Sequence, residues 1–112
     1  MVDFGRIIAE LEAIRRTPSI YVQPVTSESL LNHLTGFQQG VIFAQSETKL
    51  VDFAESASQA VLDRGWTSPS NVVGEMRSKR LSDAQIFEEV LSIVIDQYRI
   101  LSKRQNERTH ES

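Results

Sequence analysis

The sequence predicts an all-α protein, a single compact bundle of four to five helices with the C-terminal helix at its centre. Apolar residues recur at helical spacing along almost the whole chain. Residues that favour helix caps and turns separate the helical stretches. At 112 residues the chain has the length of one domain, and its 40% hydrophobic and 24% charged residues are typical of a globular protein.

The first helix should begin near Asp3 and end at Thr17, because a residue before proline is pushed out of the α region. The stretch from Pro18 to Val25 holds two prolines, and we expect a short extended connector there. One stripe of the first helix carries five apolar residues: Phe4, Ile7, Ile8, Leu11 and Ile14.

A second helix should be capped by Thr26 or Ser27. Gly36 and Gly40 lie four residues apart within it, and each costs about 1 kcal/mol relative to Ala. Small residues at such positions let another element approach closely, so we expect Tyr21 to pack nearby. The buried stripe of this helix has six members: Leu30, Leu31, Leu34, Phe37, Val41 and Ile42.

The third helix should begin at Ser46 or Thr48 and run to about Arg64, with Gly65 in the position that follows a helix end. Its inward face is expected to hold six residues: Leu50, Phe53, Ala54, Ala57, Val61 and Leu62.

A shorter fourth helix should start at Ser68-Pro69, with Trp66 covering the junction before it. Its apolar face has three members: Val72, Val73 and Met76.

The last helix should open with the capping box Ser82–Gln85 and run to Leu101. It is apolar around most of its circumference, which is typical of a helix in the middle of a bundle or at an oligomer interface. Residues 1–101 therefore form the predicted helical domain, and residues 102–112 form a polar tail that we expect to be frayed.

Charge and composition exclude several function classes. The net charge of −3 gives no basic surplus for neutralising phosphates, so a general nucleic-acid binder is disfavoured. Without Cys there is no disulfide, thiolate nucleophile or cysteine zinc site. The chain shows neither a basic-then-apolar leader nor an apolar run that could cross a membrane, and we expect a cytoplasmic protein.

Catalytic groups are sparse. The histidines are His33, on the polar side of its helix, and His110, in the tail, so a histidine dyad or multi-histidine metal site is hard to assemble. No helical metalloprotease motif, phosphate-binding loop or dinucleotide fingerprint occurs. We therefore predict a protein that is not an enzyme, with no catalytic residue, no metal site and no cofactor.

Acidic side chains are the one informative polar feature. Asp52, Glu55 and Asp63 line one stripe of the third helix, and Glu88 and Glu89 lie on the outer side of the last one. Such stripes could steer a basic protein partner, and these five residues are the predicted contact residues. The alternative interpretation is a solubilising surface.

The run Arg77-Ser78-Lys79-Arg80 is the corresponding basic cluster. It could touch phosphate in a nucleic-acid-binding regulator, or it could be the cationic end of a helix, which the helix dipole favours.

Several of these features also occur together in a known group of proteins. The first helix ends in Arg15-Arg16-Thr17-Pro18-Ser19-Ile20-Tyr21-Val22, and a helix with Leu30, Leu34, Gly36 and Phe37 follows, then Gly65-Trp66 and Ser82-Asp83-Ala84-Gln85-Ile86-Phe87. This order resembles small all-helical bacterial proteins with the pattern R-x-P-x-M-Y, several of which resemble immunity proteins encoded beside polymorphic or contact-delivered toxins. The resemblance implies an all-α fold and a toxin partner.

Together, the resemblance and the charge placement predict a non-enzymatic immunity protein. It would neutralise a cognate bacterial toxin by covering the toxin's active site or a functional surface, and the acidic stripes would suit a basic toxin such as a nuclease. The alternative is a small regulatory or scaffold protein that forms a homodimer or larger oligomer through its last helix, because that helix carries a wide apolar stripe.

Overall fold

The computed structural model describes residues 3–44 and 50–111, and within these ranges the chain is all helical, without a strand. The predicted all-α fold is therefore confirmed. The elements in chain order are α1 (Phe4–Arg16), α2 (Pro18–Tyr21), α3 (Ser27–Ala44), α4 (Leu50–Asp63), the 3₁₀ helix η2 (Pro69–Asn71), α5 (Val72–Ser78) and α6 (Asp83–Glu111).

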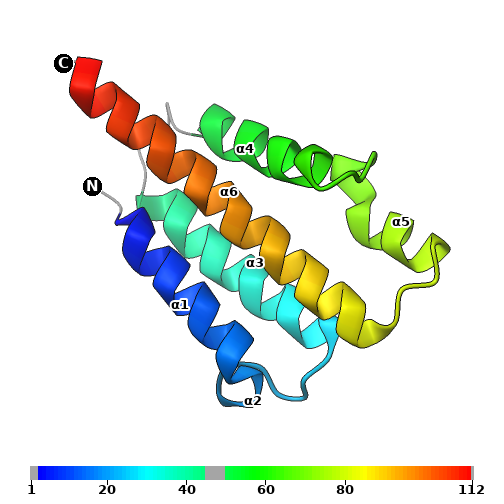
Figure 1. Cartoon of the computed structure of the whole chain (residues 1–112). Coiled ribbons are helices and arrows are strands. Elements are labelled where there is room, and N and C mark those ends of the chain that lie inside the picture. Colours follow the sequence, from blue (N-terminus) through cyan, green and yellow to red (C-terminus); the bar gives the residue numbers. More distant parts are fainter. Residues whose placement is uncertain (1–2, 45–49, 112) are drawn as a thin grey trace.

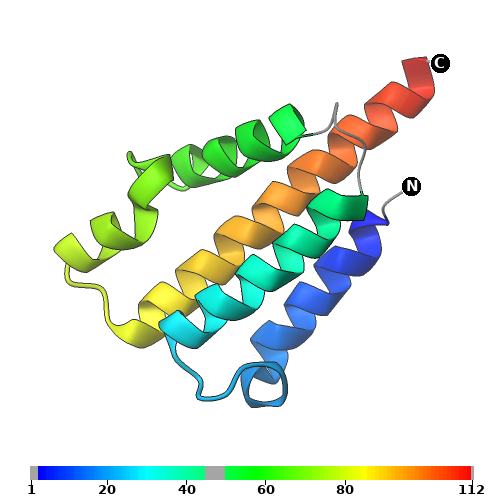
Figure 2. The same cartoon turned by 180° about the vertical axis from the view of Figure 1, so that it is seen from behind.

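Helix α6 is the central element. Helices α1 and α4 lie on opposite flanks of it, α3 lies behind it, and α5 packs near its N-terminal half (Figures 1 and 2). Each of these four helices contacts α6, whereas the described residues of α3 and α4 make few contacts with each other. The bundle is therefore organised around one helix rather than around a common axis.

The sequence of α6 explains this central position. The capping box forms, because Ser82 N donates to Gln85 Oε1 at 2.7 Å and Gln85 N donates to Ser82 Oγ at 3.2 Å. Only a narrow arc of the helix between Gln85 and Arg99 faces solvent. Its buried apolar residues are Ile86, Phe87, Val90, Leu91, Ile93, Val94, Ile95, Tyr98 and Leu101.

The polar segment after Leu101 is helical as far as Glu111, so α6 extends beyond its predicted end at Leu101. A tertiary contact supports part of this extension. The Arg104 guanidinium lies 3.6 Å from the Asp52 carboxylate and 3.5 Å from that of Glu55 on α4. The polar composition of the segment thus marks a solvated helix.

Tyr98 lies at the centre of an aromatic cluster, with ring centroids 6.1 Å from Phe4, 6.3 Å from Phe37 and 6.1 Å from Phe53. These rings come from α1, α3 and α4, so one side chain of α6 joins three helices. The Tyr98 side chain is fully buried, and burial raises the pKa of its hydroxyl far above the usual range.

Helix α1 follows its predicted boundaries. The Asp3 carboxylate accepts a hydrogen bond from Arg6 N at 3.1 Å and caps the helix, which ends before Thr17-Pro18. The next residues are not an extended connector as predicted, because Pro18–Tyr21 form the single-turn helix α2. Proline is well suited to the first position of a helix, so the residue that stops α1 also starts α2.

Tyr21 does not pack against Gly36 of α3, contrary to the prediction. It is 44% exposed, Ile20 beside it is 72% exposed, and a Cβ at Gly36 would meet nothing within 4 Å. The side chain that anchors this segment is instead Val22, which is buried. The surroundings of Gly40 lie outside the described residues.

Helix α3 begins as predicted, because Thr26 Oγ1 accepts a hydrogen bond from Ser29 N at 3.2 Å. Leu30 and Leu34 are buried, and Leu31 and Phe37 are partly buried against the core. The predicted core positions Val41 and Ile42 lie outside the residues whose side chains are described.

The buried face of α4 differs from the prediction. Ser56, Ala60 and Val61 are buried, whereas Ala54 is exposed and Leu62 is 53% exposed. The proposed first residues Ser46 and Thr48 and the side chain of Leu50 lie outside the described part of the chain. The helix is rotated so that small side chains face α6, which lets the two helices pack closely.

Two helices end in the same hydrogen-bonded motif, with different residues at its left-handed position. After α4, Gly65 N donates to Leu62 O at 3.0 Å and Trp66 N donates to Val61 O at 3.2 Å, with Gly65 at φ +90°. This confirms the predicted role of Gly65. Trp66 packs partly buried against the core, as expected.

The corresponding bonds after α5 run from Arg80 N to Arg77 O at 3.0 Å and from Leu81 N to Met76 O at 3.2 Å, with Arg80 at φ +63°. A non-glycine residue in this region costs roughly 1–2 kcal/mol. The same geometry is therefore less favourable at Arg80 than at Gly65.

Arg80→Gly should accordingly raise the free energy of unfolding by about 0.5–1 kcal/mol, because glycine adopts a positive φ without steric cost but loses more entropy on folding. Thermal and urea unfolding would measure the change. Gly65→Ala is the matched control and should lower stability by about 1 kcal/mol. A destabilised Arg80→Gly variant would contradict this explanation.

Candidate protein-interaction surface

The five predicted contact residues come from two helices that pack on each other. Asp52, Glu55 and Asp63 lie along α4, while Glu88 and Glu89 lie on α6. Glu55 and Asp63 line one hollow, whereas Glu88 and Glu89 line another.

Glu88 and Glu89 both form ion pairs with arginines of the same chain. A Glu88 carboxylate oxygen lies 2.9 Å from Arg15 Nε on α1, and Glu89 pairs with the guanidinium of Arg64, which follows α4. The hydrogen bond with Glu89 raises the pKa of Arg64 further above its usual range. Because each of them is paired with an arginine, these two residues are weaker candidates than Asp63 for attracting a partner.

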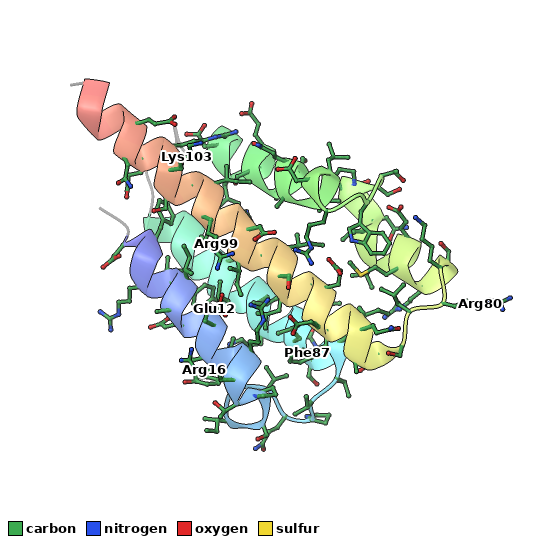
Figure 3. All side chains as sticks on the ribbon, in the orientation of Figure 1. Glu12, Arg16, Arg80, Phe87, Arg99 and Lys103 are labelled. Atoms are coloured by element: carbon green, nitrogen blue, oxygen red, sulfur yellow. The ribbon has the colours of Figure 1, made fainter. Side chains whose placement is uncertain are left out.

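They belong to a network that crosses the exposed face of α6. Arg15 also pairs with Glu12 at 3.0 Å, Glu12 with Arg99 at 3.2 Å, and Arg99 with Asp96 at 3.4 Å. Asp96 then pairs with Arg64 at 3.3 Å. Figure 3 shows the side chains of Glu12 and Arg99 on this face, between α1 and α6. The network joins α1, α6 and the end of α4, and each partly exposed pair adds roughly 0–1 kcal/mol to stability.

The acidic face of α4, defined by Asp52, Glu55, Gln59 and Asp63, is different. The Arg104 guanidinium reaches Asp52, Glu55 and, at 3.3 Å, the Gln59 amide oxygen. The Asp63 side chain is exposed and pairs with no cation among the described residues. Asp52 and Glu55 thus share one guanidinium, and over the described residues this face, with Asp63, keeps a net negative charge.

An exposed apolar residue lies among these carboxylates. Glu55, Leu62 and Asp63 line one shallow hollow together with Ala54, Ser58, Gln59 and Arg104. Leu62 is 53% exposed, and the Glu55 side chain is 60% exposed. A lysine or arginine of a partner could lay its aliphatic stem on Leu62 and its charged head on either carboxylate.

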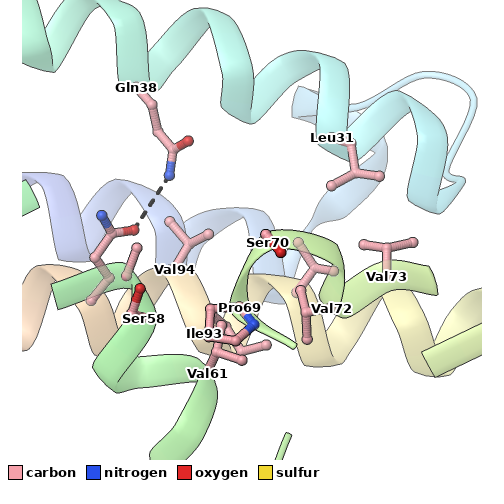
Figure 4. Close-up of a pocket in the computed structure, with 13 residues that line it drawn as sticks. Leu31, Gln38, Ser58, Val61, Pro69, Ser70, Val72, Val73, Ile93 and Val94 are labelled. Atoms are coloured by element: carbon pink, nitrogen blue, oxygen red, sulfur yellow. Dashed lines mark hydrogen bonds between the residues drawn. The ribbon is translucent and has the colours of Figure 1, made fainter. Parts of the chain in front are cut away.

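The other flank of α4 borders an apolar groove of about 510 Å³. Its floor is α6 and its walls are α3 on one side and α4, η2 and α5 on the other (Figure 4). The apolar lining includes Leu31, Val61, Val72, Val90, Ile93 and Val94. The sequence does not predict this groove, because the groove depends on how three helices pack. It forms where α3 and α4 both pack on α6 while their described residues make few contacts with each other.

An amide pair is the polar part of the groove. Gln38 Nε2 on α3 donates to Gln97 Oε1 at 3.4 Å, and the buried Gln97 donates from Nε2 to the Phe53 carbonyl oxygen at 3.1 Å. The second bond joins the floor of the groove to α4, so Gln97 is satisfied by the fold.

Two further carboxylates, Glu75 and Asp83, accept hydrogen bonds from residues outside their own helices. Asp83 accepts hydrogen bonds from the Ser27 hydroxyl and from Ser27 N, which ties the start of α6 to the start of α3. Glu75 accepts from Thr67 N and Ser68 N, both at 2.9 Å. These bonds lower the pKa of both carboxyl groups, chiefly the Ser27 hydroxyl for Asp83 and the Thr67 amide for Glu75. Neither role is visible in the sequence, because each depends on hydrogen bonds to residues outside the acid's own helix.

Stability should therefore fall in acid. Because the folded-state pKa values of Glu75 and Asp83 lie below the unfolded ones, their contribution is complete above about pH 4 and is lost as the pH falls through the folded-state values. Thermal unfolding between about pH 2 and about pH 7 would show this loss. Asp83→Asn should flatten the acid limb of that curve, and an unchanged limb would contradict the assigned role.

The candidate catalytic and basic residues are dispersed. His33 is exposed on α3, and among the described residues no three metal-binding side chains come together. Lys79 lies 5.2 Å from the centroid of the Trp66 ring and 3.5 Å from the Glu75 carboxylate. Arg80 projects away from the body of the protein (Figure 3). The basic run thus spans the C-terminal end of α5, and Lys79 contacts Trp66 and Glu75 within the protein.

None of the helices in the described ranges combines the length and apolar character that crossing a membrane would require. The chain matches no protein-family model, no curated protein and no solved structure.

Proposed function

We propose that this protein is a cytoplasmic, non-enzymatic immunity protein that binds a cognate bacterial toxin and neutralises it by covering its active site or a functional surface. The contact region is the acidic face of α4. The observation that carries the proposal is the hollow in which Glu55 and Asp63 flank the exposed Leu62, since it pairs negative charge with apolar surface.

The charge of this face defines the chemistry of the partner. A nuclease binds phosphates with lysine and arginine side chains, so its functional surface is basic. An acidic face that meets this surface would steer association and compete with the nucleic acid. Glu88 and Glu89, which are paired within the protein, are not part of the proposed contact.

The experiment uses the toxin domain encoded beside the gene for this chain. Co-expression should restore growth of cells that produce the toxin domain, and the two purified proteins should form a stoichiometric complex. The association rate should fall as salt is raised, because electrostatic steering is screened. Full toxin activity at equimolar protein, without a complex, would contradict the proposal.

The scaffold alternative loses its main support. It rests on an apolar stripe too wide for a monomer, yet nearly all of that stripe is buried inside the single chain, beneath α1, α3, α4 and α5. We therefore expect a monomer in sedimentation. A tight homodimer would restore the alternative.

A further inference from the structure

Helix α4 separates two surfaces of opposite chemistry. Its acidic face lies on one flank, and the apolar groove over α6 lies on the other. Ser58 lines both the groove and the acidic hollow. Ala54, Ser58 and Leu62 follow at four-residue intervals, so two small side chains and one exposed leucine form the crest between the flanks.

The described residues that line the groove carry no charge. Its lining among the described residues consists of aliphatic side chains, small polar residues and the two glutamines, in a chain of which 24% of the residues are charged. Its floor runs from Val90 to Gln97, which corresponds to roughly 10 Å of helix. This length suits a few apolar side chains from two turns of a bound segment.

We propose that the groove and the acidic face form one continuous site for an amphipathic segment that carries aliphatic side chains beside lysines or arginines. The aliphatic side chains enter the groove over Val94, and the cations reach Glu55 and Asp63 across the crest. The inference rests on the proposed function, since it names the kind of toxin segment that this face receives.

Charge complementarity selects this occupant over the others. A second copy of the chain placed symmetrically on the site would set acidic face against acidic face, and like charges across an interface disfavour association. A neutral apolar compound would fill the groove but would make no use of the negative charge of Glu55 and Asp63. A basic amphipathic segment uses both surfaces.

The test uses three synthetic helical peptides: one of leucine and lysine, one with the lysines replaced by glutamate, and one with the leucines replaced by serine. Binding is followed by fluorescence anisotropy. The leucine–lysine peptide should bind the wild-type protein at least tenfold more tightly than either of the other two. Equal affinity for the serine–lysine peptide or for the leucine–glutamate peptide would overturn the proposal.

Substitutions in the groove test whether the leucine–lysine peptide binds there. Ser70→Trp places a large ring at an exposed position that lines the groove, and Ala57→Leu narrows the groove from α4. Each should weaken leucine–lysine peptide binding at least tenfold, with folding checked by thermal melting. Ser78→Trp, an exposed serine of α5 outside the groove lining, is the matched control and should leave the affinity unchanged. Unchanged affinity of the leucine–lysine peptide for both Ser70→Trp and Ala57→Leu would overturn the proposal.

The toxin domain then separates the two claims. If it binds wild-type protein and both groove-filled variants equally, the groove is not used and the proposed function stands. If it does not bind at all while the peptide still depends on the groove, the proposed function fails and the site for a basic amphipathic segment stands.

Discussion

Leu91→Ala should lower the free energy of unfolding by about 3 kcal/mol and the melting temperature by on the order of 10 °C. Leu91 is fully buried in the N-terminal third of α6, the helix that α1, α3, α4 and α5 contact. The cavity would therefore open between α6 and the helices packed on it, where close packing limits how far neighbours can move to fill it. Such a loss is a large part of the roughly 5–15 kcal/mol that stabilises a domain.

Leu62→Ala is the matched control because it makes the same chemical change on the surface. Leu62 is 53% exposed, so its truncation should alter stability by no more than about 0.5 kcal/mol. Chemical denaturation of both variants measures the difference. Equal losses at the two leucines would show that α6 is not the core helix.

Reversing two charges on α4 should have the largest effect on function. Glu55→Lys combined with Asp63→Lys should weaken toxin binding about 100-fold, which corresponds to about 2.7 kcal/mol. The reversal removes two attractive contacts and adds two repulsive ones, and it should slow association most. Asp52 is left unchanged, because it faces Arg104 and its side chain is only 17% exposed.

The control for this variant carries the same change in net charge at another place. Both double reversals move the charge from −3 to +1, since replacing two acids by two lysines adds four. Glu10→Lys with Glu28→Lys alters exposed positions on α1 and α3 and should change affinity less than fivefold. Equal losses in both variants would mean that overall charge, rather than α4, governs binding.

The features that the sequence predicted correctly are those fixed by neighbouring residues. The capping box Ser82–Gln85, the Asp3 cap and the left-handed Gly65 each depend on hydrogen bonds within a few residues, and all three form. The central position of α6 was predictable as well, because an apolar arc of that width can be buried only on several partners.

The predictions were wrong where the local sequence was compatible with two structures. Pro18 is compatible with both an extended connector and the first residue of a helix, and the chain adopts the second. In α4 the apolar pattern contains so many small residues that it is also consistent with a buried face on the neighbouring stripe of the helix. Close packing on α6 selected Ser56 and Ala60 over Ala54 and Leu62.

The candidate site was predictable only in part. The stripe of Asp52, Glu55 and Asp63 follows from helical spacing, but the pairing of acids with distant arginines does not. Glu88 and Arg15 are far apart in sequence and meet because α1 packs on α6. The apolar groove is likewise a product of three helices that meet on a fourth. Contacts between residues far apart in the sequence thus determine which acidic side chains form ion pairs within the protein.

The most direct measurement is to follow backbone amide signals of the labelled protein by NMR while the unlabelled toxin domain is added. The largest changes should fall in 52–63 on α4 and in the groove wall at 69–73. Changes concentrated in α1 and α2, with α4 unaffected, would contradict the assignment of α4 as the working surface of this protein.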